Sequence, residues 1–289
     1  MKSLLPFALV LVIILANSPL RAQENNVIFS TSDPAPELKS SDGRFQVNMR
    51  GRILADWSAG SDNNNANDFS GTKLRAARLG IGGQATENIN FRLDVELGQD
   101  KVSVKDAYIQ FKKNDWAVTV GQSKIPNSLE WNTAISQTTV MERAAFRTAF
   151  GFGRAMGIKA STGGNNWGLS AGIFQGNNNF SSATNEGYIA AARATYGGNI
   201  DNGKWLVGVS GRYKNEKDNG TIRYKAKSIT NLSMTMSDFK SNATKETLLA
   251  AEAALTAGAF FASAEYAFVN ANDAIAVGEN GKFSGGYAE

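Results

Sequence analysis

The stretch INFRLDVELGQ, residues 89–99, carries an apolar side chain at every second position. Successive side chains of a strand point to opposite faces, so this alternation predicts a strand with one apolar and one charged face. Its length matches the roughly 9–11 residues that a tilted strand needs to cross a bilayer. A membrane barrel turns the apolar face to lipid and the charged face to a wet lumen, whereas a soluble sandwich does the reverse. Features elsewhere in the chain must distinguish the two.

The N-terminal residues predict an exported protein. Lys2, an apolar stretch over residues 4–16 and the small residue Ala22 together predict a cleaved signal peptide over residues 1–22. An uncleaved anchor is the alternative, but the apolar stretch is shorter than the roughly 20 residues of a spanning helix. We expect a polar lead-in over residues 23–43 and a barrel over residues 44–289. The strand pattern is interrupted at Glu289, so we expect the barrel to be truncated at its C-terminal end.

The composition argues against several classes of protein. The chain has no cysteine and no histidine, which removes disulfides, Ser-His and Cys-His catalysis and the commonest metal ligand. We therefore expect no enzymatic activity, no cofactor and no metal; with a net charge of only +4, we also expect no nucleic-acid partner. The mean hydropathy of −0.27 resembles that of a soluble protein, as it does in membrane barrels, where only alternate residues face lipid.

Alternation recurs along the chain and predicts an all-β fold, a transmembrane antiparallel β-barrel. The expected strands cover residues 44–57, 73–83, 89–99, 102–112, 116–121, 154–161, 167–175, 188–196, 205–213, 248–257 and 260–268, with a further start at 285–289. Tyrosine or tryptophan brackets small apolar residues in strands 188–196 and 205–213, as in the aromatic girdles of membrane barrels. Residues 122–152 break the rhythm and predict a long loop. Residues 220–245 predict a hairpin extension or a second long loop.

Four segments together resemble the phosphate-selective porin family of Gram-negative outer membranes. They are KLRAARLGIGG at residues 73–83, VKDAYI at 104–109, VGQSKIPNSLE at 120–130 and VMER at 140–143. Their order and spacing also fit the family, and the resemblance extends over residues 44–176.

This resemblance implies a homotrimeric porin in the outer membrane, in contact with its lipid, with about sixteen strands per complete barrel. It implies that the loop after the fifth expected strand folds inward and narrows a channel for small anions such as phosphate, polyphosphate and chloride. The motif match assigns Arg75, Lys124 and Arg143 as anion-binding cations, with Asp106 as the acidic neighbour of Lys124. The chain departs from the family at Ala76, where the phosphate channels have a second arginine, and at Ser123, where they have an aromatic residue.

Alternatives to these roles follow from the residues themselves. Parity in a regular strand places Arg75 and Arg78 on opposite faces, so only one would face the lumen. The other would snorkel to the interface or sit beside a bulge at the glycines. Asp94 and its neighbours on the charged face of residues 89–99 are expected to form an electrostatic ladder rather than a binding site. Glu142 and Arg143 could tether the loop to the wall by a salt bridge. A barrel with a structural, adhesin or receptor role is the main alternative to a diffusion channel, and a soluble all-β protein is a further one.

Overall fold

The computed structural model describes residues 27–30, 36–61, 68–98, 102–138, 140, 142–176, 187–216, 222–227, 230, 232, 235–241, 243–276 and 278–289. The predicted signal peptide and the asparagine-rich tip at residues 62–67 lie outside these ranges.

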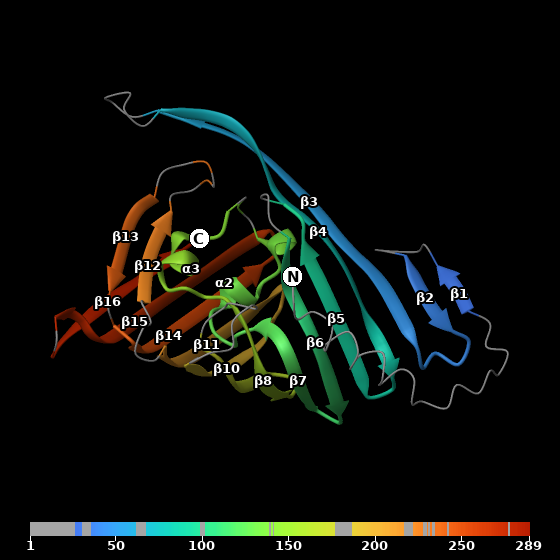
Figure 1. Cartoon of the computed structure of the whole chain (residues 1–289). Helices are drawn as coiled ribbons and strands as arrows, with labels where there is room; N and C mark the ends of the chain where they lie inside the picture. The colour runs from blue at the N-terminus through green and yellow to red at the C-terminus, as the bar shows by residue number, and fades with distance from the viewer. Residues whose placement is uncertain are drawn as a thin grey trace, which may run out of the picture.

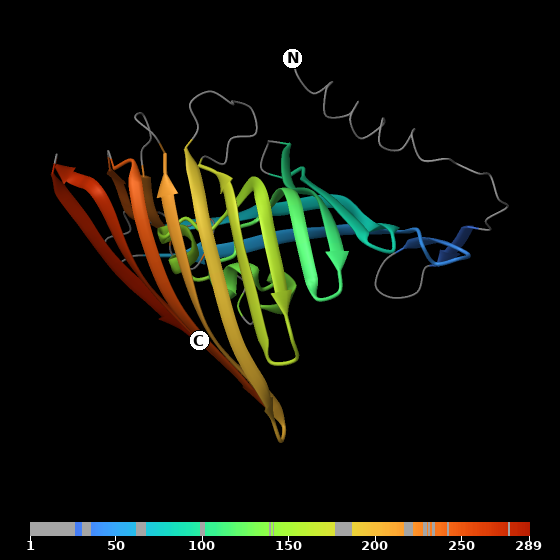
Figure 2. The same ribbon diagram turned by 90° about the horizontal axis from the view of Figure 1, so that it is seen from below.

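Fourteen strands of the described residues pair into one antiparallel sheet, with β1 and β16 at its two edges. Neighbouring strands follow chain order except that β11 pairs directly with β14. The sheet curves strongly, so that one face is concave (Figures 1 and 2). Its strands are β1 Val27–Ser30, β2 Glu37–Ser40, β3 Gln46–Gly60, β4 Phe69–Thr86, β5 Ile89–Glu96, β6 Ser103–Lys113, β7 Trp116–Lys124, β8 Arg154–Gly163, β9 Trp167–Gln175, β10 Tyr188–Ile200, β11 Gly203–Asn215, β14 Lys245–Ala257, β15 Phe260–Ala276 and β16 Glu279–Ala288.

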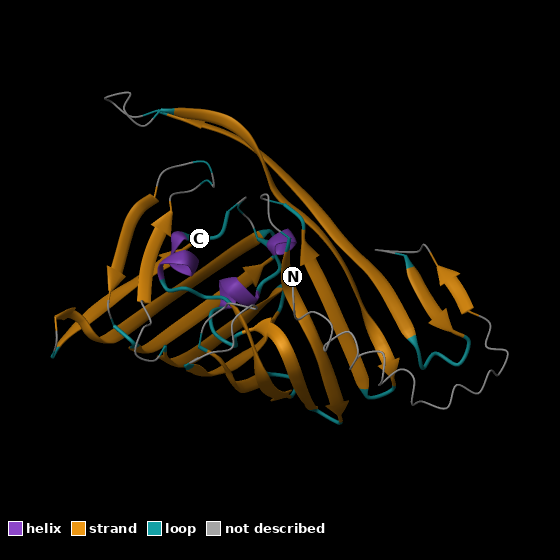
Figure 3. Cartoon of the chain, in the orientation of Figure 1, coloured by secondary structure: helices purple, strands orange, loops and turns teal. Residues whose placement is uncertain are grey.

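The remaining elements lie on the concave side of the sheet (Figures 1 and 3). Between β7 and β8, the loop of residues 125–153 contains α2 (Leu129–Asn132), the 3-10 turn η1 (Ile135–Gln137) and α3 (Ala145–Ala149). A separate hairpin of β12 (Ile222–Lys227) and β13 (Thr235–Ser241) packs its first strand against α3. None of the helices in the described part of the chain is long and apolar enough to cross a bilayer.

The strands expected from alternation are all present. The predicted start at residues 285–289 belongs to β16, and the hairpin expected within residues 220–245 is β12–β13. The polar lead-in differs from expectation because it contains β1 and β2, which extend the sheet at the edge of β3. Each of these strands has only four residues, too few to show an alternating pattern. β2 pairs with backbone groups at the edge of β3, and β1 then pairs with β2.

The two faces of the sheet have opposite chemistry. In β5, Leu93 is 41% exposed whereas the next residue, Asp94, is 1% exposed on the concave side. Large apolar side chains are exposed along the other strands as well, among them Ile53, Ile173 and Leu249. An apolar outer surface with charges turned inward is the arrangement that a bilayer favours and that water disfavours.

An apolar cluster fills the part of the concave face next to β14 and β15. Phe146, Phe150 and Phe152 of the loop pack on Leu248 and Val269 of these strands. Burial of such large side chains contributes about 1.5–3 kcal/mol each, so this contact holds the loop firmly against one wall. The opposite wall, built from β3 to β8, is left to polar and charged groups.

At Gly121 in β7 the backbones of β6 and β7 approach so closely that no side chain fits between them. The φ of Gly121 is +122°, and a Cβ placed there would lie 2.3 Å from the carbonyl oxygen of Ala107. We expect Gly121→Ala to lower the free energy of unfolding by about 2 kcal/mol or more, through backbone strain and the clash. Urea unfolding followed by heat-modifiable mobility on gels measures this loss. Gly71→Ala is the matched control, because its Cβ would meet no heavy atom within 4 Å; equal effects of the two substitutions would contradict the prediction.

Candidate functional site

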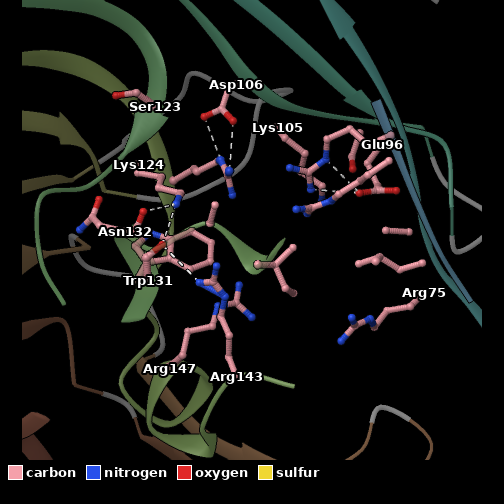
Figure 4. Close-up of a pocket in the computed structure, with 18 of the residues that line it drawn as sticks. Arg75, Glu96, Lys105, Asp106, Ser123, Lys124, Trp131, Asn132, Arg143 and Arg147 are labelled. Carbon is pink, nitrogen blue, oxygen red and sulfur yellow. Dashed lines mark hydrogen bonds and ion pairs between the residues drawn. The ribbon is translucent and has the colours of Figure 1, made fainter. Parts of the chain in front are cut away.

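A cavity of about 890 Å³ lies between the inward loop and the wall of β3 to β8. Among the described residues, its lining holds eleven basic side chains against three acidic ones, Glu96, Asp106 and Glu142. The basic residues are Arg50, Arg52, Arg75, Arg78, Arg92, Lys105, Lys124, Arg143, Arg147, Arg154 and Lys159. All four residues assigned from the motifs are therefore on one cavity (Figure 4). Their role in anion binding remains a prediction.

A β-bulge brings Arg75 and Arg78 to the same cavity. In the β3–β4 ladder, Leu54 pairs with Ala76 and Ala55 with Leu74, so Arg75 is the extra residue. A bulge places two residues opposite one and shifts the side-chain parity beyond it. The expectation that only one of the two arginines faces inward was therefore wrong, because it assumed a regular strand.

A second bulge places Lys105 beside Asp106 on the cavity. Asp94 pairs with Asp106 and Val95 with Val104, which leaves Lys105 as the extra residue of β6. Strict alternation places Lys105 on the face opposite to its neighbour Asp106, so alternation alone offers no reason to expect Lys105 on the cavity. A signal was nevertheless present, because the apolar outward positions change from even numbers at Val104 to odd numbers at Ala107.

Asp106 and Lys124 do not form the direct pair that the motif match implied. Asp106 accepts two hydrogen bonds from Arg154, at 2.9 and 3.0 Å. Arg92 lies 3.7 Å from the same carboxylate. Lys124 instead donates to the carbonyl oxygens of Trp131 at 2.7 Å and Asn132 at 3.1 Å. A guanidinium offers two parallel donors to a carboxylate, so Arg154, which sequence reasoning missed, is the better partner.

Ion pairs line the wall as an electrostatic ladder, as predicted for the charged face of β5. Arg92 pairs with Asp94 at 2.6 Å, and Arg78 pairs with Glu96 at 3.0 Å. Asp94 also lies 3.6 Å from Arg50 of β3. The Arg78–Glu96 pair joins β4 to β5 and the Arg50–Asp94 contact joins β3 to β5, whereas Arg92 and Asp94 both belong to β5.

The loop is tied to the β4 wall through Glu142. Its carboxylate lies 2.6 Å from Nη1 of Arg75, which also contacts Asp56 at 3.1 Å. The tether foreseen for Glu142 and Arg143 therefore involves Glu142. Arg143 turns back into the loop and donates to the carbonyl oxygens of Glu130 at 2.6 Å and Thr133 at 2.5 Å.

On the opposite side, Glu265 of β15 holds α2. Its carboxylate accepts from Ser128 Oγ at 3.2 Å and from the backbone N–H groups of Leu129 at 3.0 Å and Glu130 at 2.6 Å. Burial raises the pKa of the Glu130 carboxyl to about 7, so part of it is neutral at physiological pH. The neutral fraction of Glu130 reduces its electrostatic repulsion with Glu265. Together, the contacts with Arg75 and Glu265 anchor the loop to both β4 and β15.

Comparison with protein families matches residues 47–289 to the model of the phosphate-selective porins O and P. The chain belongs to this family. The match confirms the resemblance found in the sequence and identifies an outer-membrane β-barrel porin of a Gram-negative bacterium. The family and the fold are those of channel proteins.

Among curated proteins, the porin is 27% identical over 272 residues to an uncharacterized protein of Caulobacter vibrioides. The match covers 88% of this chain and 54% of the relative, so the chain spans about half the length of the curated relative it matches.

Solved structures give weaker similarities. OmpT of Vibrio cholerae, described in its trimer form, matches with a TM-score of 0.36 and 11% identity over 85% of this chain and 89% of that chain. A mutant of the Rh. blastica porin matches with a TM-score of 0.32 and 11% identity over 84% and 99% of the two chains. Similarities of this degree carry no weight for function.

The site of the porin contains groups suited to anions. Within the described ranges, no cluster of acidic side chains is arranged to hold a metal ion. Sequence reasoning did not single out Arg147 and Lys159, which reach the cavity from α3 and β8. Arg147 lies in the predicted loop, where no periodicity indicates which side chains point to the cavity.

Proposed function

We propose that the porin is a passive diffusion channel selective for small anions, with phosphate-type oxyanions and chloride as its solutes. The observation that carries the proposal is the excess of eleven basic over three acidic side chains on one cavity. A low-dielectric wall focuses the field of such charges, which raises the local concentration of anions and lowers their entry barrier. Arginine and lysine interact with anions in different ways. The guanidinium of arginine can donate two parallel hydrogen bonds to phosphate oxygens, whereas the ammonium of lysine acts as a point charge.

The loop of residues 125–153 is the constriction in this proposal. Its contacts with Arg75 on β4 and with Glu265 on β15 support a position across the concave face. The motif residues Arg75, Asp106, Lys124 and Arg143 would then stand where a permeating anion passes. Asp106 and Glu142 temper the field, so that an anion that enters can also leave.

We include a homotrimer in the proposal, on the strength of the family alone. Chemical cross-linking in outer membranes, followed by unheated gel electrophoresis, distinguishes a trimer from a monomer.

Single-channel recording in planar bilayers tests the channel. The full chain is reconstituted, its reversal potential is measured in a KCl gradient, and inorganic phosphate is then titrated. We expect an anion-biased reversal potential and a block of chloride current by phosphate. Conductance without anion bias would overturn the selectivity. Absence of conductance from folded protein would favour a structural, adhesin or receptor barrel.

A further inference from the structure

Four cationic side chains surround the indole ring of Trp131 in α2. The distances to the ring centroid are 4.4 Å for Arg147, 5.1 Å for Arg154, and 5.4 Å each for Lys124 and Arg143. Lys124 ends β7, Arg154 begins β8, and Arg143 and Arg147 belong to the loop between them, the latter in α3. Figure 4 shows Lys124, Arg143 and Arg147 gathered around the ring. Cations within about 6 Å of an indole face are attracted by the ring quadrupole.

Within the part of the chain that the structure describes, three of these cations have no carboxylate partner, and of the four only Arg154 forms an ion pair, with Asp106. Within the described residues, Lys124 and Arg143 are held by loop carbonyl oxygens, and Nε of Arg147 is buried without a hydrogen-bond partner. Like charges this close repel one another, so something other than counter-charge has to hold them together.

The ring itself is fixed and cannot move away from the cations. Trp131 is 6% exposed, and its Nε1–H donates to the carbonyl oxygen of Gly153 at 2.9 Å. Its backbone N–H donates to Ser128 Oγ at 3.1 Å, which closes the first turn of α2. The indole is thus a rigid surface at the centre of the cluster.

An aromatic ring and a carboxylate have different consequences for a channel. A carboxylate would cancel one positive charge for each one it held, whereas a ring quadrupole attracts cations and carries no net charge. Burial, with Arg147 nearby, lowers the pKa of Arg143 to about 10, so this guanidinium stays protonated at neutral pH. Arg143 therefore keeps its charge beside the ring.

We propose that Trp131 is a positioning residue for anion selectivity: its indole holds Lys124, Arg143 and Arg147 together on the cavity without neutralising them, so that their joint field acts on small oxyanions. This inference rests on the proposed channel function and adds to it the device that concentrates the charge. Neither the motif match nor the family description assigns a role to this residue.

Fluorination of the ring tests the proposal. Site-specific replacement of Trp131 by 4,5,6,7-tetrafluorotryptophan weakens the quadrupole while nearly preserving the shape and keeping the Nε1–H donor. We expect the anion-over-cation permeability ratio, measured from the reversal potential of the full chain in a KCl gradient, to fall on the order of threefold. The affinity of inorganic phosphate for the blocking site should fall with it. The same replacement at Trp167, which is 49% exposed on the outer face, is the matched control and should leave both quantities unchanged.

The results of this experiment distinguish the proposed role of Trp131 from the proposed anion-channel function. If the unmodified porin is anion-selective and the fluorinated ring leaves the ratio unchanged or raises it, the role of Trp131 is overturned and the channel proposal stands. If the unmodified porin shows no anion bias, the channel proposal fails first. Trp131→Phe, which keeps a weaker quadrupole but loses the Nε1–H donor, should give an intermediate ratio; a ratio equal to that of the unmodified porin would also count against the proposal.

Discussion

A Lys105→Glu variant is expected to lower the anion-over-cation permeability ratio by about tenfold, because it changes the local charge by two units beside the permeating ion. Lys105 lines the cavity and forms no ion pair with the described residues, so the substitution removes an uncompensated cation and adds an uncompensated anion. The reversal potential in a KCl gradient measures the ratio. The effect should shrink as the salt concentration rises, because salt screens the added charge.

Lys113→Glu is the control for this charge reversal. It changes the net charge equally, in the same strand, but Lys113 is exposed at the end of β6 beside the turn to β7 and does not line the cavity. We expect little change in its permeability ratio. Equal effects from Lys105→Glu and Lys113→Glu would show that selectivity follows net charge rather than the cavity.

The second large effect is expected from Glu265→Ala, which removes the acceptor that holds α2 against β15. Ser128 Oγ and the backbone N–H groups of Leu129 and Glu130 would lose their partner in a buried place, at a cost of about 1–3 kcal/mol for each donor left unpaired. We expect the segment around α2 to leave the wall, with a higher single-channel conductance and a lower thermal stability.

Two further variants separate release of the loop from general destabilisation. Glu265→Gln keeps one acceptor oxygen and should give a conductance between those of the alanine variant and the unmodified porin. Glu279→Ala removes an exposed carboxyl from the neighbouring strand β16 and should leave conductance unchanged. A Glu265→Ala porin with lower stability but unaltered conductance would contradict the role of this contact in the constriction.

Local sequence was sufficient for most of the sheet. In β5 the alternation of apolar and charged residues predicted both the strand and the inward side of Asp94, because side chains alternate faces along a strand without a bulge. Sequence motifs were sufficient to bring Arg75, Asp106, Lys124 and Arg143 to one cavity. The motifs did not predict the hydrogen-bond and ion-pair partners of these side chains. A lysine or arginine pairs with whichever acceptor the fold brings near, as Lys124 does with the carbonyl oxygen of Trp131.

The sequence by itself determined most of the strands, the family and the outward side of the apolar residues, since each depends on neighbours along the chain. Only the tertiary structure decided which charges meet. The bulges at Arg75 and Lys105 shift parity by one residue, and a single shift moves a side chain to the other face. The contacts of Glu142 with Arg75 and of α2 with Glu265 join segments far apart in sequence. The gathering of cations around Trp131 likewise arises only when β7, β8 and the loop fold together, because no local pattern encodes contacts between them.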